Sequence, residues 1–447
     1  MENYDVIIIG AGISGLALGF ELKKAGLKFK ILEKAAAGGK LAVTQEAGYV
    51  LDWAANGFLG VPDSLQLVEE LGLGDQLEPT DPEAKKRYLY RHGVLEPLPT
   101  SPPSFLKSPL LLPSEKLRAA AEFFISPAKE DLSVFATLQR RFGKAFAERF
   151  AQIFVSGISA GDAKVLSFQA LFPRLREIEE TKGSLLKGMI AQAKLSKAAK
   201  DPRLGRLQSF KGGMATLSSR LAEVLDQDLA VYEAVQSIEA DADGYMLYTP
   251  KQTYHAKKLA LTTPAFVSAG LLKDILPQTA LLHDIPYVDV QVFGLAYHRI
   301  DVPHALDGFG FLVPPEEGLS LLGVLFSSST FPSQSPPHTA LLRIITGGSL
   351  NPDFAKQSPD EALKQVKTDL KKTLGIHAEP LWQKAIFIDK AIPQYQLGHR
   401  QLISQVLHEG AKKQLYLGGN AFLGVAVNDC IRDAKRLSRA LGAKIAS

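Results

Sequence analysis

The sequence predicts a chain of mixed class, in which both ends form an α/β domain and an α+β domain with a mixed sheet lies between them. Three patterns indicate this arrangement. A strand, glycine-rich turn, helix and second strand open the chain, and a similar strand, turn and helix close it. Alternating apolar segments over residues 287–348 are typical of a largely antiparallel sheet. A chain of 447 residues exceeds a single hydrophobic core, so two or three domains are expected.

The opening segment has the spacing of a dinucleotide-binding turn. Val6–Ile9 reads as a strand buried on both faces, and Gly10, Gly12 and Gly15 then form G-x-G-x-x-G. The first glycine permits the tight turn, the second lets the backbone approach a pyrophosphate, and the third lets the helix pack on the strand. A helix over about 13–24 would point its N-terminal amides at the phosphates.

The acid that ends the second strand narrows the choice of nucleotide. Glu33 is expected to accept hydrogen bonds from ribose hydroxyls, and its charge disfavours the 2′-phosphate of NADP. Lys34 follows, and Gly38, Gly39 and Lys40 then match the pattern E-[KR]-x(n)-G-G-[RK] of many flavoproteins. Because a simple NAD dehydrogenase does not need this second glycine pair, FAD is favoured, with an ordinary glycine turn as the alternative.

The elements between the two ends follow in order. A helix is expected over 64–73, and a hairpin that turns at His92-Gly93 begins near residue 87. Residues 114–200 have a helical pattern and no strand period, which indicates an inserted helical region. A β-meander over 229–264, with Asp243-Gly244 as a hairpin turn, precedes the larger sheet, and a helix over 359–373 follows it.

The closing unit is expected to give a flavin its second contact. Gly418-Gly419-Asn420 ends the strand, and Gly424–Asn428 precedes the helix, with Asn428 or Asp429 as the expected cap. Amides at the N-terminus of this helix would stabilise negative charge on a reduced flavin, and Val425 and Val427 would lie against the ring. A capped helix after a glycine turn, without a ligand, is the alternative.

Composition excludes several classes of protein. A net charge of +4 is too small to argue for nucleic acid, although it suits an acidic ligand or an anionic membrane surface. The single cysteine, Cys430, excludes an internal disulfide and fits a reducing compartment. We expect no cleavable signal before the first strand, and the sequence has no run of about 18 apolar residues that could span a membrane. No nucleophile triad, metal-spaced cluster or paired acids occur, so neither a catalytic acid–base residue nor a metal is expected.

Five segments give a more specific indication: GVAVNDCI, IPQYQLGH, GFGFLVP, LPTSPPSFL and SAGDAKVLSFQALFP. Together they resemble the oxygen-dependent protoporphyrinogen IX oxidases, which belong to the amine-oxidase-like FAD superfamily. The resemblance runs from the first strand to the last helix. The first glycine motif is generic to the superfamily, whereas GVAVNDCI with IPQYQLGH is far more specific.

The resemblance implies a Rossmann-like FAD domain, a mixed-sheet substrate domain and an inserted helical domain that binds membrane lipid. The FAD domain would comprise residues 1–85, 201–262 and 391–447. The substrate domain would comprise residues 86–104 and 263–390, and the helical region residues 105–200.

The resemblance also implies site residues. The expected cofactor-binding residues are Gly10, Ala11, Gly12, Ile13, Ser14, Gly15, Glu33, Lys34, Gly39, Lys40, Ala54, Ala55, Asn56, Gly57, Val235, Val425, Ala426 and Val427. The expected substrate-binding residues are Asn56, Gly157, Phe309 and Leu312. Val235 would approach the adenine, Asn56 would face the substrate, and Phe309 with Leu312 would sandwich the tetrapyrrole.

The implied reaction is the six-electron oxidation of protoporphyrinogen IX to protoporphyrin IX, by three hydride transfers to the flavin, with O2 as acceptor and H2O2 as product. The protein must hold a bridge carbon of the substrate about 3–3.5 Å from flavin N5 and exclude water. Relatives often carry an arginine after LPT that is proposed to meet a propionate, but here the nearest cation is Lys107. The choice between protoporphyrinogen and coproporphyrinogen therefore stays open. So do an amine-oxidase-like enzyme with Tyr395 in its cage, and a porphyrin-binding flavoprotein without turnover.

The leucine- and proline-rich run Phe105–Pro113, with Lys107, Lys116 and Arg118, has the composition of an interfacial segment. Ordinary packing on the substrate domain is the alternative. The expected partners are a porphyrinogen, O2 and a peripheral membrane surface, with no nucleic acid and with a homodimer left open. The expected location is the cytoplasm, at the inner face of the cell membrane.

Overall fold

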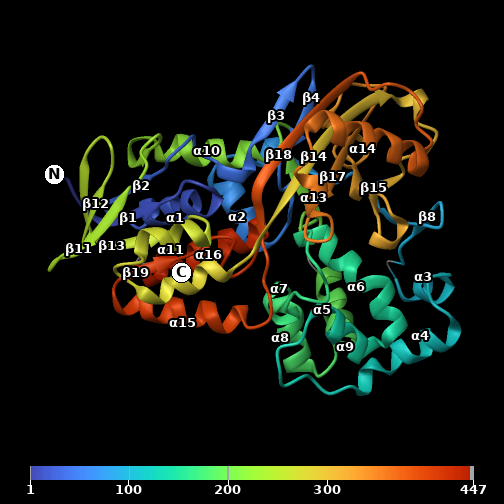
Figure 1. Ribbon diagram of the computed structural model, residues 1–447, viewed down its shortest axis with the longest axis horizontal. Helices are drawn as coiled ribbons and strands as arrows, with labels where there is room; N and C mark the ends of the chain where they lie inside the picture. Colours follow the sequence, from blue (N-terminus) through green and yellow to red (C-terminus); the bar gives the residue numbers. More distant parts are fainter. Residues whose placement is uncertain (1, 100, 199–200, 443–447) are drawn as a thin grey trace.

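The computed structural model describes residues 2–99, 101–198 and 201–442. Figure 1 shows three parts: a sheet with its helices around both chain ends, a second sheet at the upper right, and a group of helices below the second sheet. We call them the first sheet, the second sheet and the helical region. The mixed α/β and α+β class predicted from the sequence is confirmed.

The first sheet joins the two ends of the chain. Its order is β10-β2-β1-β13-β12-β11, and β19 also pairs with β13. The strands are β1 (Glu2–Ile9), β2 (Phe29–Leu32), β10 (Leu229–Ala230), β11 (Ser237–Ala240), β12 (Tyr245–Tyr248), β13 (Thr253–Leu261) and β19 (Leu415–Leu417). Strands β10, β2, β1, β13 and β19 are parallel, and β11, β12 and β13 form an antiparallel meander. Since β1 and β19 both pair with β13, the N- and C-terminal units lie in one sheet.

Helices cover both faces of the first sheet. Val6 and Ile8 pack in a cluster with α1 (Ile13–Lys24), α10 (Ala215–Leu225) and α16 (Val427–Ala440), while Ile7 and Ile9 pack in a second cluster with α11 (Ala265–Leu272) and α15 (His399–Lys412). The helix α2 (Pro62–Glu70) joins the first cluster. This double burial explains the unbroken apolar run of β1 that the sequence shows.

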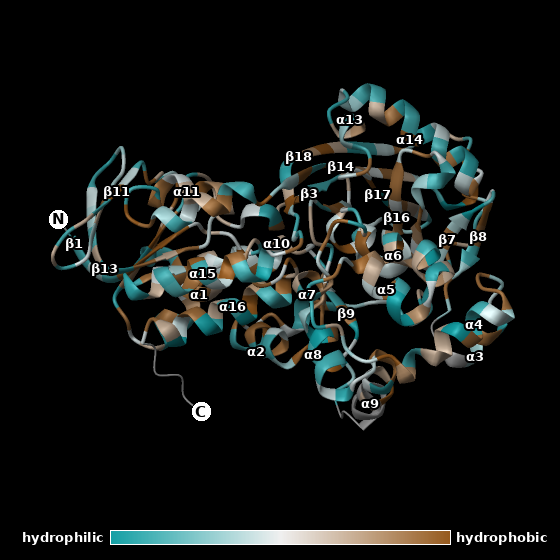
Figure 2. Cartoon of the chain, turned by 60° about the horizontal axis from the view of Figure 1, so that its bottom comes forward, coloured by the Kyte–Doolittle hydropathy of each residue, from teal (hydrophilic) through white to brown (hydrophobic). Residues whose placement is uncertain are grey.

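The second sheet has the order β18-β14-β17-β16-β15-β7-β8. Its strands are β7 (Lys86–Arg91), β8 (Val94–Pro97), β14 (Tyr287–His298), β15 (Gly308–Leu312), β16 (Leu321–Phe326), β17 (Thr339–Gly347) and β18 (Trp382–Pro393). All neighbours are antiparallel except β15 and β7. The helix α14 (Pro359–Leu374) packs on one face, and Figure 2 shows apolar colour along β17 beside a mixed polar α14.

The helical region consists of α3 (Pro102–Lys107), α4 (Pro113–Ala120), η3 (Ala121–Phe124), α5 (Val134–Phe142), α6 (Lys144–Ser159), α7 (Phe168–Leu171), α8 (Pro173–Lys182) and α9 (Leu185–Ala198). An ion-pair network holds it together. The fully buried guanidinium of Arg141 binds Glu122 and Glu179, and Glu122 also accepts from the Leu185 amide. Buried charges are tolerated only with such partners. Within the described residues, no helix combines the length and the apolar character needed to cross a bilayer.

Two small sheets connect the larger parts. One pairs β3 (Val43–Glu46) with β4 (Tyr49–Asp52), and the other has the order β5 (Phe58–Leu59), β9 (Leu207–Phe210), β6 (Leu77–Pro79). Leu51 of β4 packs against the second sheet at Gly294, where an added Cβ would lie only 2.8 Å from the Leu51 side chain. The glycine therefore permits the close approach of β4 to the second sheet.

Several predicted elements differ in detail. The first strand of the meander is two strands, β10 and β11, and Val235 lies in the loop between them because β10 turns away to pair with β2. The N-cap of α16 is Ala426 rather than Asn428 or Asp429, and Asp429 instead accepts the Ala426 amide from the first turn. Several elements were not predicted, among them β18, α15, α10, α11 and the strands of the two small sheets. The domain boundaries proposed from the sequence remain predictions.

Candidate active site

The glycine turn leaves open space in front of α1. Gly10 has a φ of 105°, and a Cβ on Gly15 would lie 1.9 Å from the Gly10 carbonyl oxygen, so both positions require glycine. A Cβ on Gly12, by contrast, would meet no atom within 4 Å. The free amides at the start of α1 thus lie beside a space that suits a pyrophosphate.

Glu33 and the second glycine pair lie against this turn. The Glu33 carboxylate accepts from the Ala11 amide at 2.7 Å, which places it beside the glycine turn at the end of β2. The Gly38 amide donates to the Ala11 carbonyl at 2.8 Å, and a Cβ on Gly39 would lie 3.2 Å from Gly12 Cα. Residues that the sequence separates by more than twenty positions therefore form one wall.

Val235 belongs to the same end of the first sheet. It is half-buried and packs on the cluster that contains Leu32, and the nearby Glu233 amide donates to the Glu33 carbonyl at 2.7 Å. This position is compatible with an adenine next to the ribose acid. Lys34, in contrast, is exposed.

Lys40 extends from this wall to the second sheet. Its ammonium donates to the carbonyls of Lys390, at 2.7 Å, and Ala391 in β18, and lies 5.8 Å from the centre of the Tyr287 ring. Burial lowers the pKa of Lys40 to about 8. A role for Lys40 in binding the cofactor stays a prediction, because its hydrogen bonds in this structure go to β18.

The C-terminal unit contributes the N-terminus of α16. Ala426 is exposed and Val425 is half-buried, whereas the Val427 side chain packs in the core with α1. What Val427 offers a ligand is therefore its backbone at the first turn of the helix. Gly419 lies next to the glycine turn, since its Cβ would be 3.8 Å from Ser14 Oγ.

The loop 54–57 lies between the two sheets. All four of its residues, Ala54, Ala55, Asn56 and Gly57, are half-buried. A Cβ on Gly57 would lie 2.6 Å from the Gln208 carbonyl oxygen, which excludes a larger residue. The Asn428 side chain donates to the Leu59 carbonyl at 2.8 Å, so α16 neighbours strand β5, which directly follows this loop.

Two functional candidates near this loop, Arg343 and Asp52, were not predicted from the sequence. Arg343 on β17 donates to the carbonyls of Asp52, Trp53 and Ala54, and the buried Asp52 carboxylate accepts from the Met214 amide at 2.7 Å. Burial raises the pKa of Asp52 to about 6. An arginine inside the apolar run TALLRIITG is a usable signal for such a site, because arginine is rarely buried without partners.

The predicted substrate residues come from three walls. The Gly157 Cβ position on α6 lies 3.6 Å from Leu312 of β15, so these two residues are brought together. Phe309 of β15 is half-buried under the guanidinium of Arg87, 5.3 Å from its ring centre. Phe154 and Ile158, one helical turn apart on α6, are exposed large apolar side chains. Asn56 belongs to the loop described above.

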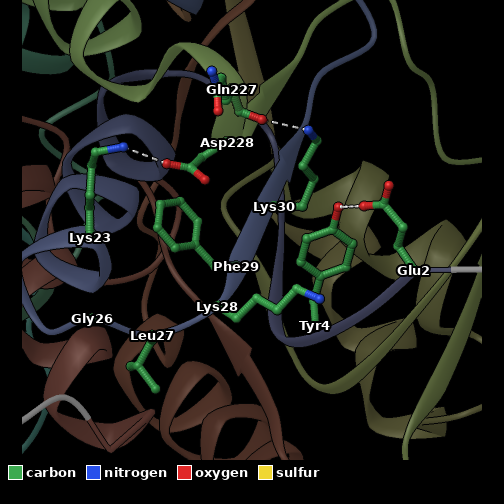
Figure 3. A pocket seen from close by; sticks show the side chains of 10 residues that line it. All are labelled: Glu2, Tyr4, Lys23, Gly26, Leu27, Lys28, Phe29, Lys30, Gln227 and Asp228. Carbon is green, nitrogen blue, oxygen red and sulfur yellow. Dashed lines mark hydrogen bonds and ion pairs between the residues drawn. The ribbon is translucent and has the colours of Figure 1, made fainter.

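A surface depression elsewhere on the first sheet is unrelated to this site. Figure 3 shows it, with a volume of about 470 Å³, lined by Glu2, Tyr4, Lys23, Gly26, Leu27, Lys28, Phe29, Lys30, Gln227 and Asp228. It lies at the amino ends of β1 and β2, whereas dinucleotides bind at the carboxyl ends of such strands. Its charges are engaged locally, for example in the ion pair of Lys23 with Asp228.

The family described as flavin containing amine oxidoreductase matches residues 13–441 of this chain, from the glycine turn to the end of α16. The chain belongs to this family. It is therefore an FAD-dependent oxidoreductase, and the predicted cofactor and enzyme class are confirmed. The open space at Gly12, the helix N-termini and Glu33 are features that fit FAD.

Relatives in this family match nearly the full length of the chain. Protoporphyrinogen oxidase 2 of Arabidopsis thaliana is 30% identical over 95% of this chain and 91% of its own. Coproporphyrinogen III oxidase of Bacillus subtilis is 27% identical over 96% of both chains. A crystal structure of an Exiguobacterium sp. 255-15 protein is 25% identical, with a TM-score of 0.83 over 98% of both chains. The resemblance inferred from the five sequence segments is thus confirmed.

Proposed function

We propose that this chain oxidises protoporphyrinogen IX to protoporphyrin IX with O2 as electron acceptor. Similarity to protoporphyrinogen oxidases over nearly the full chain carries this proposal. Bound FAD would supply the redox chemistry: in each round the substrate would lose a hydride to the flavin and a proton to solvent, and O2 would reoxidise the flavin to give H2O2. Loss of six electrons requires three such rounds for each porphyrin.

The residues of the first sheet hold the cofactor in this proposal. Amides at the start of α1 bind the pyrophosphate in the space beside Gly12, and Glu33 exchanges its bond with the Ala11 amide for ribose hydroxyls. The N-terminus of α16 supplies a positive dipole end where negative charge develops on the flavin.

The second sheet and α6 bind the macrocycle. Gly157 provides room beside Leu312, and the exposed Phe154 and Ile158 extend the apolar wall. Such a wall suits an uncharged macrocycle and excludes water from the reacting carbon. Arg87, which lies over Phe309, is the cation that we propose to meet a propionate, in place of the arginine missing after LPT.

An amine-oxidase-like activity has less support. Tyr395, the residue that a cage for an amine would use, is almost fully buried, and its hydroxyl donates to the Asn420 carbonyl and accepts from the Gly424 amide at 3.1 Å. The Tyr395 hydroxyl thus both donates and accepts within the protein. The His399 ring stacks on the Tyr395 ring, with the two ring centroids 4.0 Å apart. Tyr395 supports the loop before α16 rather than an open chamber.

The experiment that tests the substrate is a comparison of porphyrin fluorescence with protoporphyrinogen IX and coproporphyrinogen III under air. We expect faster formation of protoporphyrin, and Phe309→Ala should raise KM several-fold while leaving the FAD content unchanged. Faster turnover of coproporphyrinogen would move the proposal to that substrate. Absence of porphyrin with both compounds, from a yellow protein, would favour a binding protein.

We also propose that the helical region binds the inner face of the cell membrane from the cytoplasm. The exposed large apolar side chains here are Leu106 of α3, Leu112 just before α4, Leu117 of α4 and Phe124 of η3, the last 88% exposed. The run Phe105–Pro113 divides in its packing, since Leu110 and Leu111 are buried beside Leu89 while Leu106 and Leu112 point outward. A surface of this kind with cations nearby is typical of interfacial binding.

A further inference from the structure

Arg343 lies where the second sheet faces loop 54–57. On β17 its neighbours Leu342 and Ile344 point into the core beneath α14, so by the alternation of a strand Arg343 points to the opposite face. Its side chain is only 4% exposed. Gly294 on β14 lies opposite Arg343 in the register, which leaves the guanidinium free access to β4.

The Arg343 guanidinium donates hydrogen bonds to three consecutive backbone carbonyls. Nε donates to the Asp52 carbonyl at 2.9 Å, and Nη2 donates to the carbonyls of Trp53 at 3.1 Å and Ala54 at 2.6 Å. Asp52 ends β4, and the three carbonyls lead directly into loop 54–57. One side chain of the second sheet thus fixes the path by which the chain leaves β4.

The Asp52 side chain anchors the same point from the other side. Its carboxylate accepts from the Met214 amide at 2.7 Å, just before α10, and lies 3.5 Å from the Gln334 amide group. The end of β4 is therefore held to both the first-sheet helices and the second sheet. A buried cation is costly, and an apolar residue often replaces one without loss of stability. The planar, forked donors of the Arg343 guanidinium instead suit a positional role, which a lysine would fill less well.

We propose that Arg343 is a positioning residue, which sets the placement of Asn56 and Gly57 against the flavin ring through the carbonyls of Asp52, Trp53 and Ala54. This inference rests on the proposed function, because it takes loop 54–57 to line the flavin. A displacement of about 1 Å at a reacting centre costs about a hundredfold in rate. Arg343 thereby couples the substrate side of the molecule to the position of the cofactor.

The chain offers a matched control in Arg299. Its guanidinium also donates to three carbonyls, those of Val302, His304 and Ala305, but these lie at the far end of β14, outside the site described above. Arg343→Met and Arg299→Met therefore remove the same kind of interaction from two places. A general loss of rigidity would appear in both variants, whereas a positional effect on the flavin would appear in the first alone.

The test combines hydrogen exchange with flavin signals. In the FAD-free protein, Arg343→Met should speed amide exchange in the peptide that covers residues 53–57 at least tenfold, and Arg299→Met should leave it unchanged. In the FAD-loaded protein, Arg343→Met should shift the visible circular dichroism of the flavin and slow its reduction by porphyrinogen at least tenfold. Arg343→Lys should restore part of each signal.

Two results would overturn the proposal. One is a folded Arg343→Met protein with wild-type exchange at residues 53–57 and wild-type flavin signals. If that variant does not fold, Arg343→Lys decides instead, because a lysine variant that equals the wild type in every signal shows that forked contacts are not needed. If the wild type itself fails to bind FAD, the proposed function falls, while the exchange measurement still decides whether Arg343 orders the loop.

Discussion

At the glycine turn, two glycines three residues apart have opposite surroundings. Gly12 faces open space, while Gly15 lies against the backbone of Gly10. We expect Gly12→Val to fold with nearly wild-type stability and to lose FAD, because the new side chain fills the space for the pyrophosphate. Gly15→Ala should instead lower the free energy of unfolding by about 2 kcal/mol or more, since its Cβ cannot fit without moving α1.

Visible absorbance and urea unfolding distinguish these two outcomes. The Gly12→Val protein should be colourless and cooperative in its unfolding. A fully yellow Gly12→Val protein would remove the pyrophosphate from this position. A colourless but unfolded one would show that the space at Gly12 has a structural use.

Asp52 makes the stability of the folded protein depend on pH, and its raised pKa fixes the sign of that dependence. Its pKa is raised by burial to about 6, from a usual value near 4. Between these two pH values the folded state binds more protons than the unfolded state, so stability falls as the pH rises and the loss is complete above about pH 6. The contribution is about 3 kcal/mol as an order of magnitude.

The variant Asp52→Asn isolates this effect, because its amide oxygen can still accept from the Met214 amide. We expect the variant to gain stability relative to the wild type, by up to about 3 kcal/mol, as the pH rises from 4 to 7. Urea unfolding at several pH values measures the difference. Parallel stability profiles for the two proteins would contradict an ionisation of Asp52 in this range.

Among the helices of the described chain, α3, α4 and η3 carry the surface proposed to bind lipid. Leu117 is 75% and Phe124 88% exposed, and burial of each such side chain contributes about 1.5–3 kcal/mol. Leu117→Asp with Phe124→Asp should therefore lower partition onto phosphatidylcholine vesicles that contain phosphatidylglycerol at least tenfold. Flotation or sedimentation of the vesicles measures it.

Ile300 provides the matched control for this surface. It is 92% exposed in the short helix η6 (Arg299–Asp301), at the end of β14 in the second sheet. Ile300→Asp should leave vesicle binding unchanged. Equal losses in both variants would indicate nonspecific adsorption, and unchanged binding of the double variant would exclude this face as the docking surface.

The elements could be predicted from the sequence where a local pattern specifies them. The turn at Gly10–Gly15, the hairpin at His92-Gly93 and the amphipathic α14 each follow from neighbouring residues. Strand β18 has no such pattern, because it is an edge strand whose exposed and buried residues do not alternate. The split of the meander also escaped prediction, since β10 is defined by its pairing with the distant β2.

The same distinction holds for the site: residues with a local spacing could be predicted, and contacts between residues far apart in the sequence could not. Glu33 and the glycines follow a spacing that the nucleotide requires, so their proximity could be expected before the structure. The contact of Arg343 with Asp52 spans 291 positions, and no local pattern relates the two residues. Lys40 likewise reaches β18 across 350 positions, which its glycine-pair motif does not indicate.

Over the whole molecule, the fold brings both ends of the chain together in the first sheet, where we propose the nucleotide site, and the middle of the chain forms the second sheet. Strands β1 and β19 both pair with β13 in the first sheet (Figure 1). The glycine turn meets the turn after β19 at Ser14 and Gly419, and Arg343 of the second sheet contacts the start of loop 54–57. In the proposed function, the second sheet and α6 supply the apolar wall of the substrate site, with Leu312, Phe154 and Ile158. Cys430 in α16 is buried, which raises its pKa to about 12, so its thiol stays protonated at neutral pH.

The most direct test of this account is to mix the FAD-loaded protein with protoporphyrinogen IX in the absence of O2 and to follow the visible absorbance of the flavin. We predict that the yellow colour bleaches, returns when air is admitted, and cycles until porphyrin fluorescence reaches its maximum. A flavin that stays yellow in the presence of the porphyrinogen, or a purified chain that cannot be loaded with FAD, would contradict the account.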